Sequence, residues 1–400
     1  MKVGLLGGTF DPLHNGHFTM ASAAITLGGI DRLIIMPSGR PPHKAGEFVL
    51  PAAYRSEMAS LAFSDQLGIE VSSLEIIRPG RSYTIDTIQQ LKKELPPDDE
   101  LILVYGSDIL NDIEHWHQPA AIMAACPLLL ASRGGFDHQG SLIKAQELAH
   151  RYGARISFFA APEIEMSSSK IREAVQGNQE WQDYVPEKIA KFINRHQLYR
   201  HQDELAALPP ELWHQLADLE RQLLPMIDKR RLIHSLNVML YALHLAIKHG
   251  IDPQQTGIAA LLHDCAKSLP KKEVIEFAIL AGDPSLAVDE LAHGPAGAWL
   301  ARTKFGIDDP VILHAINFHT TACSGMTPLD KIIFIADKVE PARTYENLNE
   351  IRRLVEFDLD AALRVCLGEI DCFLQREQLP PHPYTRHASD ELDQRQNGKI

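Results

Sequence analysis

The first half of the chain alternates short, mostly apolar runs with stretches of helical spacing. The runs that predict buried strands are Val3–Leu6, Leu33–Met36, Leu101–Tyr105, Leu128–Ala131 and Ile156–Phe159. Helical patterns lie between most of them, and this strand–helix–strand order is typical of a mostly parallel sheet covered by helices. The first half is therefore predicted to be an α/β domain.

Beyond residue 205 the spacing of apolar residues is helical and shows no strand-like alternation. Glycine or proline separates several of the stretches, as expected between amphipathic helices. Predicted helices include Leu232–Lys248, Gln255–Lys267, Val288–Phe305, Pro310–Phe318, Pro328–Lys338 and Ile351–Gln375. The second half is therefore predicted to be an all-α helical bundle.

A polar stretch separates the two halves. Arg200–Pro210 ends in a Pro-Pro pair, a composition typical of a linker. Helical spacing already begins before it, from Ser167 to Tyr199. We predict domains at residues 1–204 and 205–378. Residues 379–400 have no apolar periodicity and are expected to form a flexible tail.

Composition narrows the class of protein. The chain has 400 residues, of which 45% are hydrophobic and 23% are charged. This composition is typical of globular proteins, and the length exceeds what a single hydrophobic core usually accommodates. With 39 basic and 52 acidic residues, the net charge of −13 argues against nucleic-acid or anionic membrane partners. The longest nearly apolar stretch, Ala120–Ala131, is too short to cross a bilayer. Oligomeric state stays open.

Two further features point to the cytoplasm. The N-terminus lacks the apolar region and cleavage site of a signal peptide. The five cysteines are scattered and form no CxxC pair, which predicts reduced thiols rather than disulfides or a thiolate metal site. We therefore expect a cytoplasmic protein.

A glycine-rich turn follows the first predicted strand. Gly7-Gly8-Thr9-Phe10 leads to His14 and His17, just before a helical stretch from Phe18. Glycines let a ligand approach the backbone, and a helix N-terminus offers free N–H groups to phosphate. Two histidines three residues apart share a face of that helix. The alternative is a tight turn with two exposed histidines, but the whole string favours phosphate binding.

A second anion-binding candidate starts another predicted helix after the last strand. Ser168, Ser169 and Arg172 lie in the run Ser-Ser-Ser-Lys-Ile-Arg, whose hydroxyls and cations are suited to a polyphosphate. Helix capping alone would also explain the serines. Its position favours binding, because parallel sheets bind ligands at the carboxyl ends of their strands.

These two segments resemble the phosphate motifs of nucleotidyltransferases with a Rossmann-like fold. Within that superfamily the first 200 residues are most similar to bacterial nicotinate-mononucleotide adenylyltransferases. The supporting residues are Pro41-Pro42-His43-Lys44, Arg81 to Thr87, Gly106-Ser107-Asp108, Trp116 and Val185 to Ala190. The pantetheine-phosphate branch, which shares both phosphate motifs, is the alternative. Tyr83-Thr84 and Trp116 argue against it.

The resemblance implies transfer of an adenylyl group from ATP to nicotinate mononucleotide, with Mg²⁺ as cofactor. His14, His17 and Lys44 would be catalytic, Ser168 and Arg172 would hold the triphosphate, and Trp116 would stack on the pyridinium ring. The full set of implied binding residues is Gly7, Gly8, Thr9, Phe10, Tyr83, Thr84, Gly106, Asp108, Trp116, Arg133, Ser168, Ser169 and Arg172.

Histidines and aspartates recur along the helical half. They are His234, His263-Asp264, His293, His319 and Asp337, spread over separate predicted helices. A single such histidine usually packs in a core or lies at a surface cap. A His-Asp pair beside the apolar run Ile258–Leu262 is different, because a buried charge is costly unless a cation compensates it. Imidazole and carboxylate ligands without thiolate suit Fe, Mn, Zn or Mg.

This pattern resembles the HD-domain metal-dependent phosphohydrolases, and within them the YqeK-type symmetrical diadenosine-tetraphosphate hydrolases. The resemblance implies two divalent ions, Fe, Mn or similar, that Asp264 can bridge and that act on diadenosine tetraphosphate. Near the phosphates, Lys267 would be catalytic and Arg343 would bind substrate. For Lys267 an exposed helix-end lysine is an equal alternative. Where glycine commonly follows His-Thr-Thr in that family, this chain has Ala322. The half could instead act on another nucleotide or serve as a nucleotide-sensing regulatory module.

Overall fold

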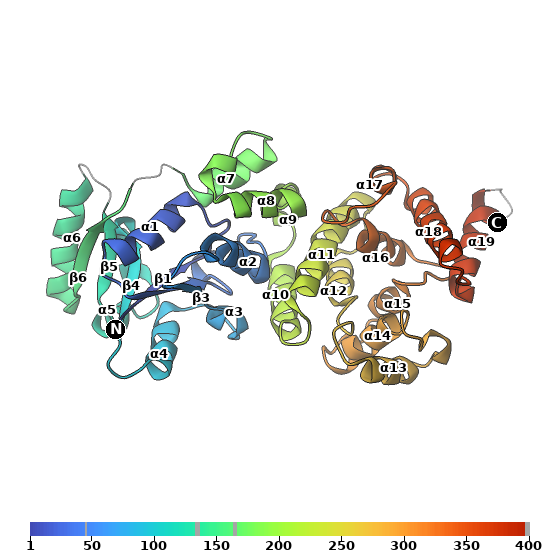
Figure 1. Ribbon diagram of the computed structural model, residues 1–400, viewed down its shortest axis with the longest axis horizontal. Helices are drawn as coiled ribbons and strands as arrows, with labels where there is room; N and C mark the ends of the chain where they lie inside the picture. The colour runs from blue at the N-terminus through green and yellow to red at the C-terminus, as the bar shows by residue number, and fades with distance from the viewer. Residues whose placement is uncertain (45, 133–136, 163–165, 397–400) are drawn as a thin grey trace. The chain divides into compact units, whose positions relative to one another are not determined.

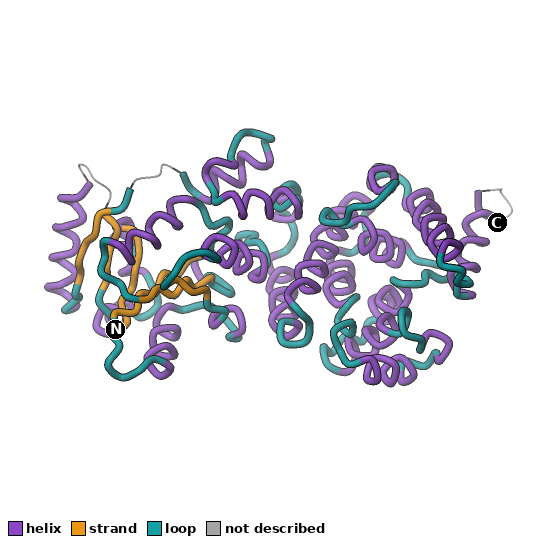
Figure 2. The backbone as a smooth tube through the Cα atoms, viewed as in Figure 1, coloured by secondary structure: helices purple, strands orange, loops and turns teal. Residues whose placement is uncertain are grey.

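The computed structural model describes residues 1–44, 46–132, 137–162 and 166–396. The chain forms two compact units: the first holds residues 1–194 and 198–200, and the second holds 195–197 and 201 onward. Figure 2 shows that the strands belong to the first unit, whereas the described residues of the second are helical or in loops.

A parallel sheet forms the centre of the first unit. Its strands are β1 (Lys2–Gly8), β2 (Arg32–Pro37), β3 (Ile69–Val71), β4 (Glu100–Gly106), β5 (Leu128–Ser132) and β6 (Ile156–Ala160). They pair in the order β3-β2-β1-β4-β5-β6, every pair parallel. The predicted α/β fold is confirmed. The sequence did not predict β3, because three residues with exposed Glu70 carry no strand pattern.

Helices cover both faces of this sheet (Figure 1). Val3 and Leu5 of β1 pack in a core with residues of α4, α5 and α6, whereas α1 and α2 lie against β2. The helices of this unit are α1 (Asn15–Thr26), α2 (Ala52–Phe63), α3 (Leu74–Ile77), α4 (Thr84–Glu94), α5 (Pro119–Ala125), α6 (Asp137–Tyr152), α7 (Ser168–Gln176) and α8 (Glu187–His196).

The strand order reverses between β1 and β4. After β1 the chain adds β2 and β3 on one side, and then β4, β5 and β6 on the other. In open α/β sheets, a ligand binds in the crevice at the carboxyl ends of the strands where the order reverses. β1 ends at Gly7-Gly8 and β4 ends at Gly106, so these three predicted binding residues lie at this point.

The second unit is a bundle of helices around α16. α16 packs against α11, α12, α15, α17 and α18, and its residues from Ile332 to Ala336 are fully buried. The helices are α9 (Gln202–Ala206), α10 (Pro210–Leu223), α11 (Lys229–His249), α12 (Pro253–Leu262), α13 (Lys271–Leu280), α14 (His293–Thr303), α15 (Pro310–Phe318), α16 (Pro328–Val339), α17 (Leu348–Val355), α18 (Leu359–Arg376) and α19 (Pro383–Gln396). The predicted all-α half is confirmed.

Several details of the fold differ from the sequence prediction, which named neither α10 nor α13. The helix predicted over Ile351–Gln375 is broken into α17 and α18, because the Asp358 carboxylate caps a new helix start. Residues 383–396, assigned to a flexible tail, form α19, whose Ala388 and Leu392 are buried. Residues 201–204, assigned to the first domain, belong to the second unit. Among the described residues, no helix is both long and apolar enough to span a bilayer.

Candidate active sites

The turn between β1 and α1 holds both predicted histidines against a helix start. His14 is the N-cap of α1: its Nδ1 accepts a hydrogen bond from the Gly16 N–H (3.1 Å), and the His14 N–H donates to Nδ1 of His17 (3.4 Å). A neutral imidazole that accepts at Nδ1 carries its proton on Nε2. Both rings therefore present an Nε2–H donor beside the helix N-terminus, where anions are stabilised.

His17 is a neutral donor. Its ring lies 3.9 Å from that of His14, centroid to centroid, and contacts Phe10 edge-on. Burial, with a smaller contribution from His14, holds the pKa of His17 well below its usual 6.5. At neutral pH the ring therefore donates one hydrogen bond without carrying a charge.

Two residues that sequence reasoning missed fix this turn. Arg55 on α2 is only 1% exposed, and its guanidinium donates to the backbone carbonyls of Thr9 (2.8 Å) and Gly39 (3.0 Å). Tyr199 donates its hydroxyl to the Asp11 carboxylate (2.9 Å). An arginine inside an alanine-rich helix is the only sequence signal for the first, and none marks the second.

α7 contacts the same turn. Ser168 donates its hydroxyl to the Pro12 carbonyl (2.9 Å), and Arg172 donates to the Asp11 carbonyl (2.7 Å) and to Ser169 Oγ (3.3 Å). Within the described part of the chain, the buried Nε of Arg172 has no hydrogen-bond partner. The structure thus joins the two predicted phosphate-binding segments, with a guanidinium at their junction.

Lys44 pairs with a carboxylate near Arg172. Its Nζ lies 2.9 Å from Glu47 Oε2. The pKa of Glu47 is lowered mainly by this hydrogen bond, and further by the charges of Lys44, Arg172 and His43. Two cations predicted to hold a triphosphate therefore act on one exposed carboxylate, with which an incoming polyphosphate would compete.

The three predicted glycines allow close contacts within the chain. A Cβ on Gly7 or Gly8 would lie 2.8 or 2.9 Å from an aromatic side chain, and one on Gly106 would lie 2.4 Å from Asp108 Oδ1. The sequence predicted close approach of a ligand, whereas the immediate constraint is this packing. Asp108 itself is exposed just beyond β4.

Aromatic rings gather at the carboxyl end of β4. Tyr83 is the N-cap residue of α4, which begins at Thr84, and its ring lies 4.3 Å from that of His117. Trp116 meets Tyr105 edge-to-face at 5.5 Å. Sequence reasoning missed Tyr105 and His117, although each is adjacent in the chain to a predicted residue.

Three other residues were predicted to bind substrate, and the structure gives a different result for each. Thr9 offers its carbonyl to Arg55. Phe10 has a φ of 53° and is 2% exposed, so its side chain packs in the interior. Arg133 lies outside the described residues.

The six predicted metal ligands converge in the second unit. They come from α11 (His234), the turn after α12 (His263 and Asp264), the start of α14 (His293), the turn after α15 (His319) and α16 (Asp337). All but His234 are at most 9% exposed. Burying so many titratable groups together costs several kcal/mol per charge unless opposite charges compensate it.

Asp264 lies at the centre of the cluster. Its Oδ1 is 3.6 and 3.5 Å from Nε2 of His293 and His319, and its Oδ2 is 3.9 and 3.7 Å from Nε2 of His234 and His263. The structure therefore offers two groups of three candidate ligands that share this carboxylate.

Asp337 joins the group around His234 and His263. Its Oδ1 lies 3.0 Å from His234 Nε2 and 3.7 Å from His263 Nε2. His263 Nδ1 donates to the Ala260 carbonyl (2.6 Å), so Nε2 carries the lone pair. That nitrogen is buried and has no hydrogen-bond partner among the described residues. A bound cation would satisfy it, and the other ring nitrogen is already oriented by a backbone carbonyl, as in metal sites.

The pKa values fit this interpretation. Burial lowers the pKa of His293 to about 3 and also lowers that of His319, so both rings are neutral, as metal ligands must be. For His234, burial lowers the pKa, but hydrogen bonds to Asp337 and Glu340 outweigh it and raise the pKa to about 9. A cation bound there at neutral pH would displace a proton.

Lys267 and Arg343 reach the cluster from its solvent side. Lys267 Nζ lies 3.0 and 3.2 Å from the two oxygens of Asp264, and Arg343 donates to Asp337 Oδ1 (3.1 Å). Their side chains are 38% and 41% exposed. Each is therefore placed to contact a ligand outside the carboxylates as well.

Three further residues at this cluster had no role assigned from the sequence. Glu340 Oε1 lies 3.3 Å from His234 Nδ1, Thr320 Oγ1 lies 3.1 Å from His293 Nε2, and Lys338 donates to a backbone carbonyl at 3.1 Å. All three stand within three positions of a predicted ligand. That adjacency was the available signal, but it does not reveal which neighbour points inward.

Ala322 adopts a left-handed backbone conformation that suits glycine better than alanine. Its φ is 58° and it is fully buried. The left-handed conformation costs a residue with a Cβ roughly 1–2 kcal/mol, and glycine avoids that cost. The backbone turn that follows His319 is nevertheless formed, because the Ala322 N–H donates to the Phe318 carbonyl (2.9 Å).

Two family models match the chain. The cytidylyltransferase-like model matches residues 5–174, and the HD domain model matches residues 231–342. The first match contains both predicted phosphate-binding segments, and the second contains all six candidate metal ligands.

Relatives cover the first half. Proteins named "Probable nicotinate-nucleotide adenylyltransferase" from Geobacter sulfurreducens and Clostridium botulinum are 37% identical over 215 residues and 34% identical over 201 residues. Each comparison covers 50% of this chain and 99% of the relative.

Solved structures resemble each half. A "predicted HD superfamily hydrolase involved in NAD metabolism" from Clostridium acetobutylicum is 34% identical, covering 44% of this chain and 96% of that one, with a TM-score of 0.42. A Plasmodium falciparum nicotinic acid mononucleotide adenylyltransferase complexed with NaAD is 18% identical, covering 50% and 97%, with a TM-score of 0.42.

Proposed function

The chain belongs through its N-terminal half to the nicotinate-nucleotide adenylyltransferase family and carries an HD domain in its C-terminal half, and from this we propose a bifunctional enzyme. The first unit transfers the adenylyl group of ATP to nicotinate mononucleotide, giving nicotinate adenine dinucleotide and pyrophosphate. The second hydrolyses diadenosine tetraphosphate to two ADP with divalent metal ions.

One observation carries the transferase proposal. The β1–α1 turn and α7 meet through Ser168 and Arg172, which brings a guanidinium beside the two imidazoles near the sheet's switch point. The phosphate of nicotinate mononucleotide attacks the α-phosphorus of ATP and pyrophosphate leaves, without a covalent enzyme intermediate. Catalysis then consists of alignment and stabilisation of charge on the phosphoryl oxygens.

Each group has a defined part in that step. The Nε2–H groups of His14 and His17 donate to the phosphoryl oxygens, and Lys44 and Arg172 neutralise the triphosphate. Asp108 has the carboxylate oxygens that Mg²⁺ prefers, and it lies exposed beyond β4. Mg²⁺ bound there supplies charge neutralisation on the phosphates.

The aromatic residues would select the acceptor. Trp116 presents a π face suited to a pyridinium cation. Backbone N–H groups at the start of α4, near Tyr83 and Thr84, are donors suited to the nicotinate carboxylate, whereas an amide would bring its own NH₂ donors to them. We therefore expect nicotinate mononucleotide to be preferred over the nicotinamide form.

The experiment for this half is a product assay. Purified protein is incubated with ATP, Mg²⁺ and one of three acceptors: nicotinate mononucleotide, nicotinamide mononucleotide or pantetheine phosphate. The proposal expects nicotinate adenine dinucleotide as the main product. A higher kcat/KM for pantetheine phosphate would replace this assignment with the other branch of the superfamily.

The hydrolase proposal for the second half rests on the buried cluster around Asp264. Both oxygens of that carboxylate face imidazoles, so it would bridge two ions of Fe, Mn or a similar metal. Two such ions polarise phosphoryl oxygens and activate water. Lys267 and Arg343 now contact Asp264 and Asp337. With those carboxylates neutralised by bound ions, the two side chains would be available to hold the tetraphosphate chain from the solvent side.

Identifying the products tests the hydrolase. With Fe²⁺ or Mn²⁺ added, symmetrical cleavage of diadenosine tetraphosphate yields only ADP, whereas asymmetrical cleavage yields ATP and AMP. The expected product is ADP. Binding of the dinucleotide with no turnover under any metal would refute hydrolysis and favour a sensing module that tunes the transferase.

A further inference from the structure

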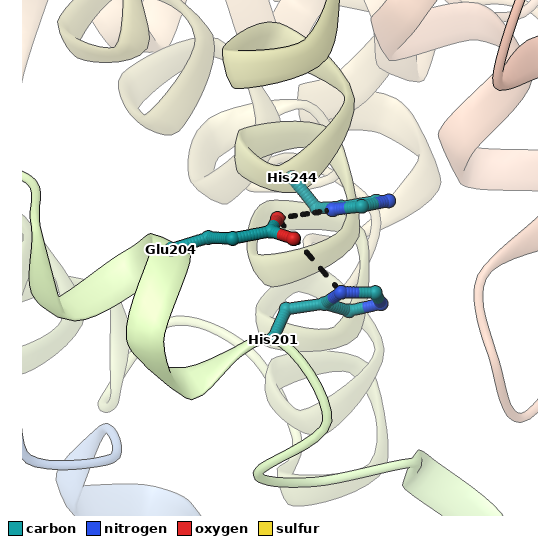
Figure 3. Close-up of side chains that lie close together, drawn as sticks. All are labelled: His201, Glu204 and His244. Atoms are coloured by element: carbon teal, nitrogen blue, oxygen red, sulfur yellow. Dashed lines mark hydrogen bonds and ion pairs between the residues drawn. The ribbon is translucent and has the colours of Figure 1, made fainter. Parts of the chain in front are cut away.

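A second group of side chains that could hold a metal ion lies at the start of the second unit, apart from the cluster around Asp264. His201 and Glu204 belong to the turn and helix α9, and His244 belongs to α11 (Figure 3). One ligand atom of each lies within 4.8 Å of the other two. His244 is ten residues beyond His234 on α11, which is about 15 Å along the helix.

The spacing of the first two residues is suited to chelation. His201 and Glu204 are three positions apart, so their side chains share one face. Glu204 Oε2 lies 2.7 Å from His244 Nδ1 and 3.9 Å from His201 Nδ1. The two imidazole rings stack, with centroids 3.7 Å apart. Both Nδ1 atoms therefore approach one carboxylate oxygen.

The other face of His244 resembles the surroundings of a metal ligand. Its Nε2 lies 3.3 Å from both oxygens of Glu356, and Lys248 pairs with that carboxylate. Metal-binding histidines commonly donate their second ring N–H to a carboxylate, which fixes the tautomer and ring orientation. With its proton on Nε2, His244 would present its Nδ1 lone pair toward Glu204, and both atoms could then bind one cation.

We propose that His201, Glu204 and His244 form a divalent-metal site that takes Zn²⁺ or a comparable ion. Two imidazoles and a carboxylate are a typical zinc ligand set, with a fourth position for water. His244 is 3% exposed, and Glu204 is exposed, so the ion has a path from solvent. The bound ion would link the short helix α9 to α11. A helix of five residues is not stable by itself, so this link would help to hold α9 in place.

The test measures zinc per chain in the full-length protein. Metal is stripped with a chelator, Zn²⁺ is added, excess is removed, and content is read by elemental analysis. His201→Gln and Glu204→Gln are the test variants, because both residues are at least partly exposed and the fold should tolerate them. His214→Gln on α10, outside the cluster, is the matched control. Each change is also made in an Asp264→Ala, Asp337→Ala background, so that zinc at the HD cluster does not obscure the count.

We expect both test variants to hold one ion fewer than their parent in both backgrounds, and the control to hold the same number. Zinc affinity, measured by competition with a chromophoric chelator, should fall at least 10²-fold. Zinc should also raise the melting temperature of the double-alanine background but not of its His201→Gln derivative. Equal zinc content and affinity in test and control variants would overturn the proposal.

Discussion

Replacing His17 tests whether one imidazole serves both the fold and the reaction. Its Nδ1 accepts the His14 N–H at the start of α1, and we propose that its Nε2–H donates to the phosphates. His17→Ala removes both interactions. His17→Gln restores an acceptor at the third helical position, where glutamine completes a capping box, but it does not restore the imidazole donor.

The magnitudes separate the two effects. Losing the cap should lower the free energy of unfolding by about 1 kcal/mol. This value is in the lower part of the range for helix caps, because the hydrogen bond is long, at 3.4 Å. A domain of this size then melts roughly 2–4 °C lower. With a typical stability of at least about 5 kcal/mol, over 99% of the protein stays folded. Losing a donor to the transition state lowers kcat about 10²- to 10³-fold, so unfolding cannot explain a loss of that size.

The assay compares three proteins by thermal melting and steady-state adenylyl transfer. His17→Ala should be less stable and at least 10²-fold slower, with little change in KM for either substrate. His17→Gln should melt like the wild type yet remain slow. A wild-type kcat in His17→Gln would show that the Nε2 donor has no part in the mechanism. Equal melting temperatures of His17→Ala and the wild type would show that the cap does not stabilise the fold.

Three other outcomes follow from the same geometry. Asp264→Ala should remove the metal and abolish phosphohydrolase activity while adenylyl transfer persists. Elemental analysis and both activity assays on one preparation would check this. Loss of both activities in a folded protein would contradict the independence of the two sites. Trp116→Ala should raise the KM for nicotinate mononucleotide about 2- to 30-fold, the range of a cation–π contact, without changing that for ATP. The hydrogen bond to Asp330, aided by Cys323, raises the pKa of His314 to about 10, so this pair's stabilisation is complete below pH 6.5 and is lost as pH rises toward 10. His314→Gln should flatten the melting temperature between pH 7 and 10, and an unchanged slope would contradict the pairing.

The parts of the fold that sequence revealed are those with a local pattern. Leu101–Tyr105 is apolar at every position because β4 is buried on both faces, and such runs are recognisable without tertiary information. The three residues of β3 lack such a pattern. α19 was missed because only a few apolar residues, Ala388 and Leu392 among them, anchor an otherwise polar helix.

The residues of the candidate sites were likewise predictable only where the local sequence carries a signal. His263 and Asp264 were identifiable because an adjacent imidazole and carboxylate at the end of an apolar run need compensation. Arg55 was not, since its role depends on carbonyls that only the folded chain brings to it. The contacts of Glu340 with His234 likewise join residues 106 positions apart. Long-range hydrogen bonding of this kind leaves no trace in the local sequence.

The shared carboxylate of Asp264 has a consequence for metal supply. One oxygen faces each imidazole group, so if Asp264 holds two ions as proposed, binding one would fix the orientation of the carboxylate for the other. Thermodynamic reciprocity then makes the two occupancies mutually dependent. Since a two-ion reaction needs both, activity would rise with a higher power of free metal concentration than a single-ion enzyme shows. In a cell with scarce metal, the hydrolase would behave as a threshold device, switched by ion availability rather than by dinucleotide concentration alone.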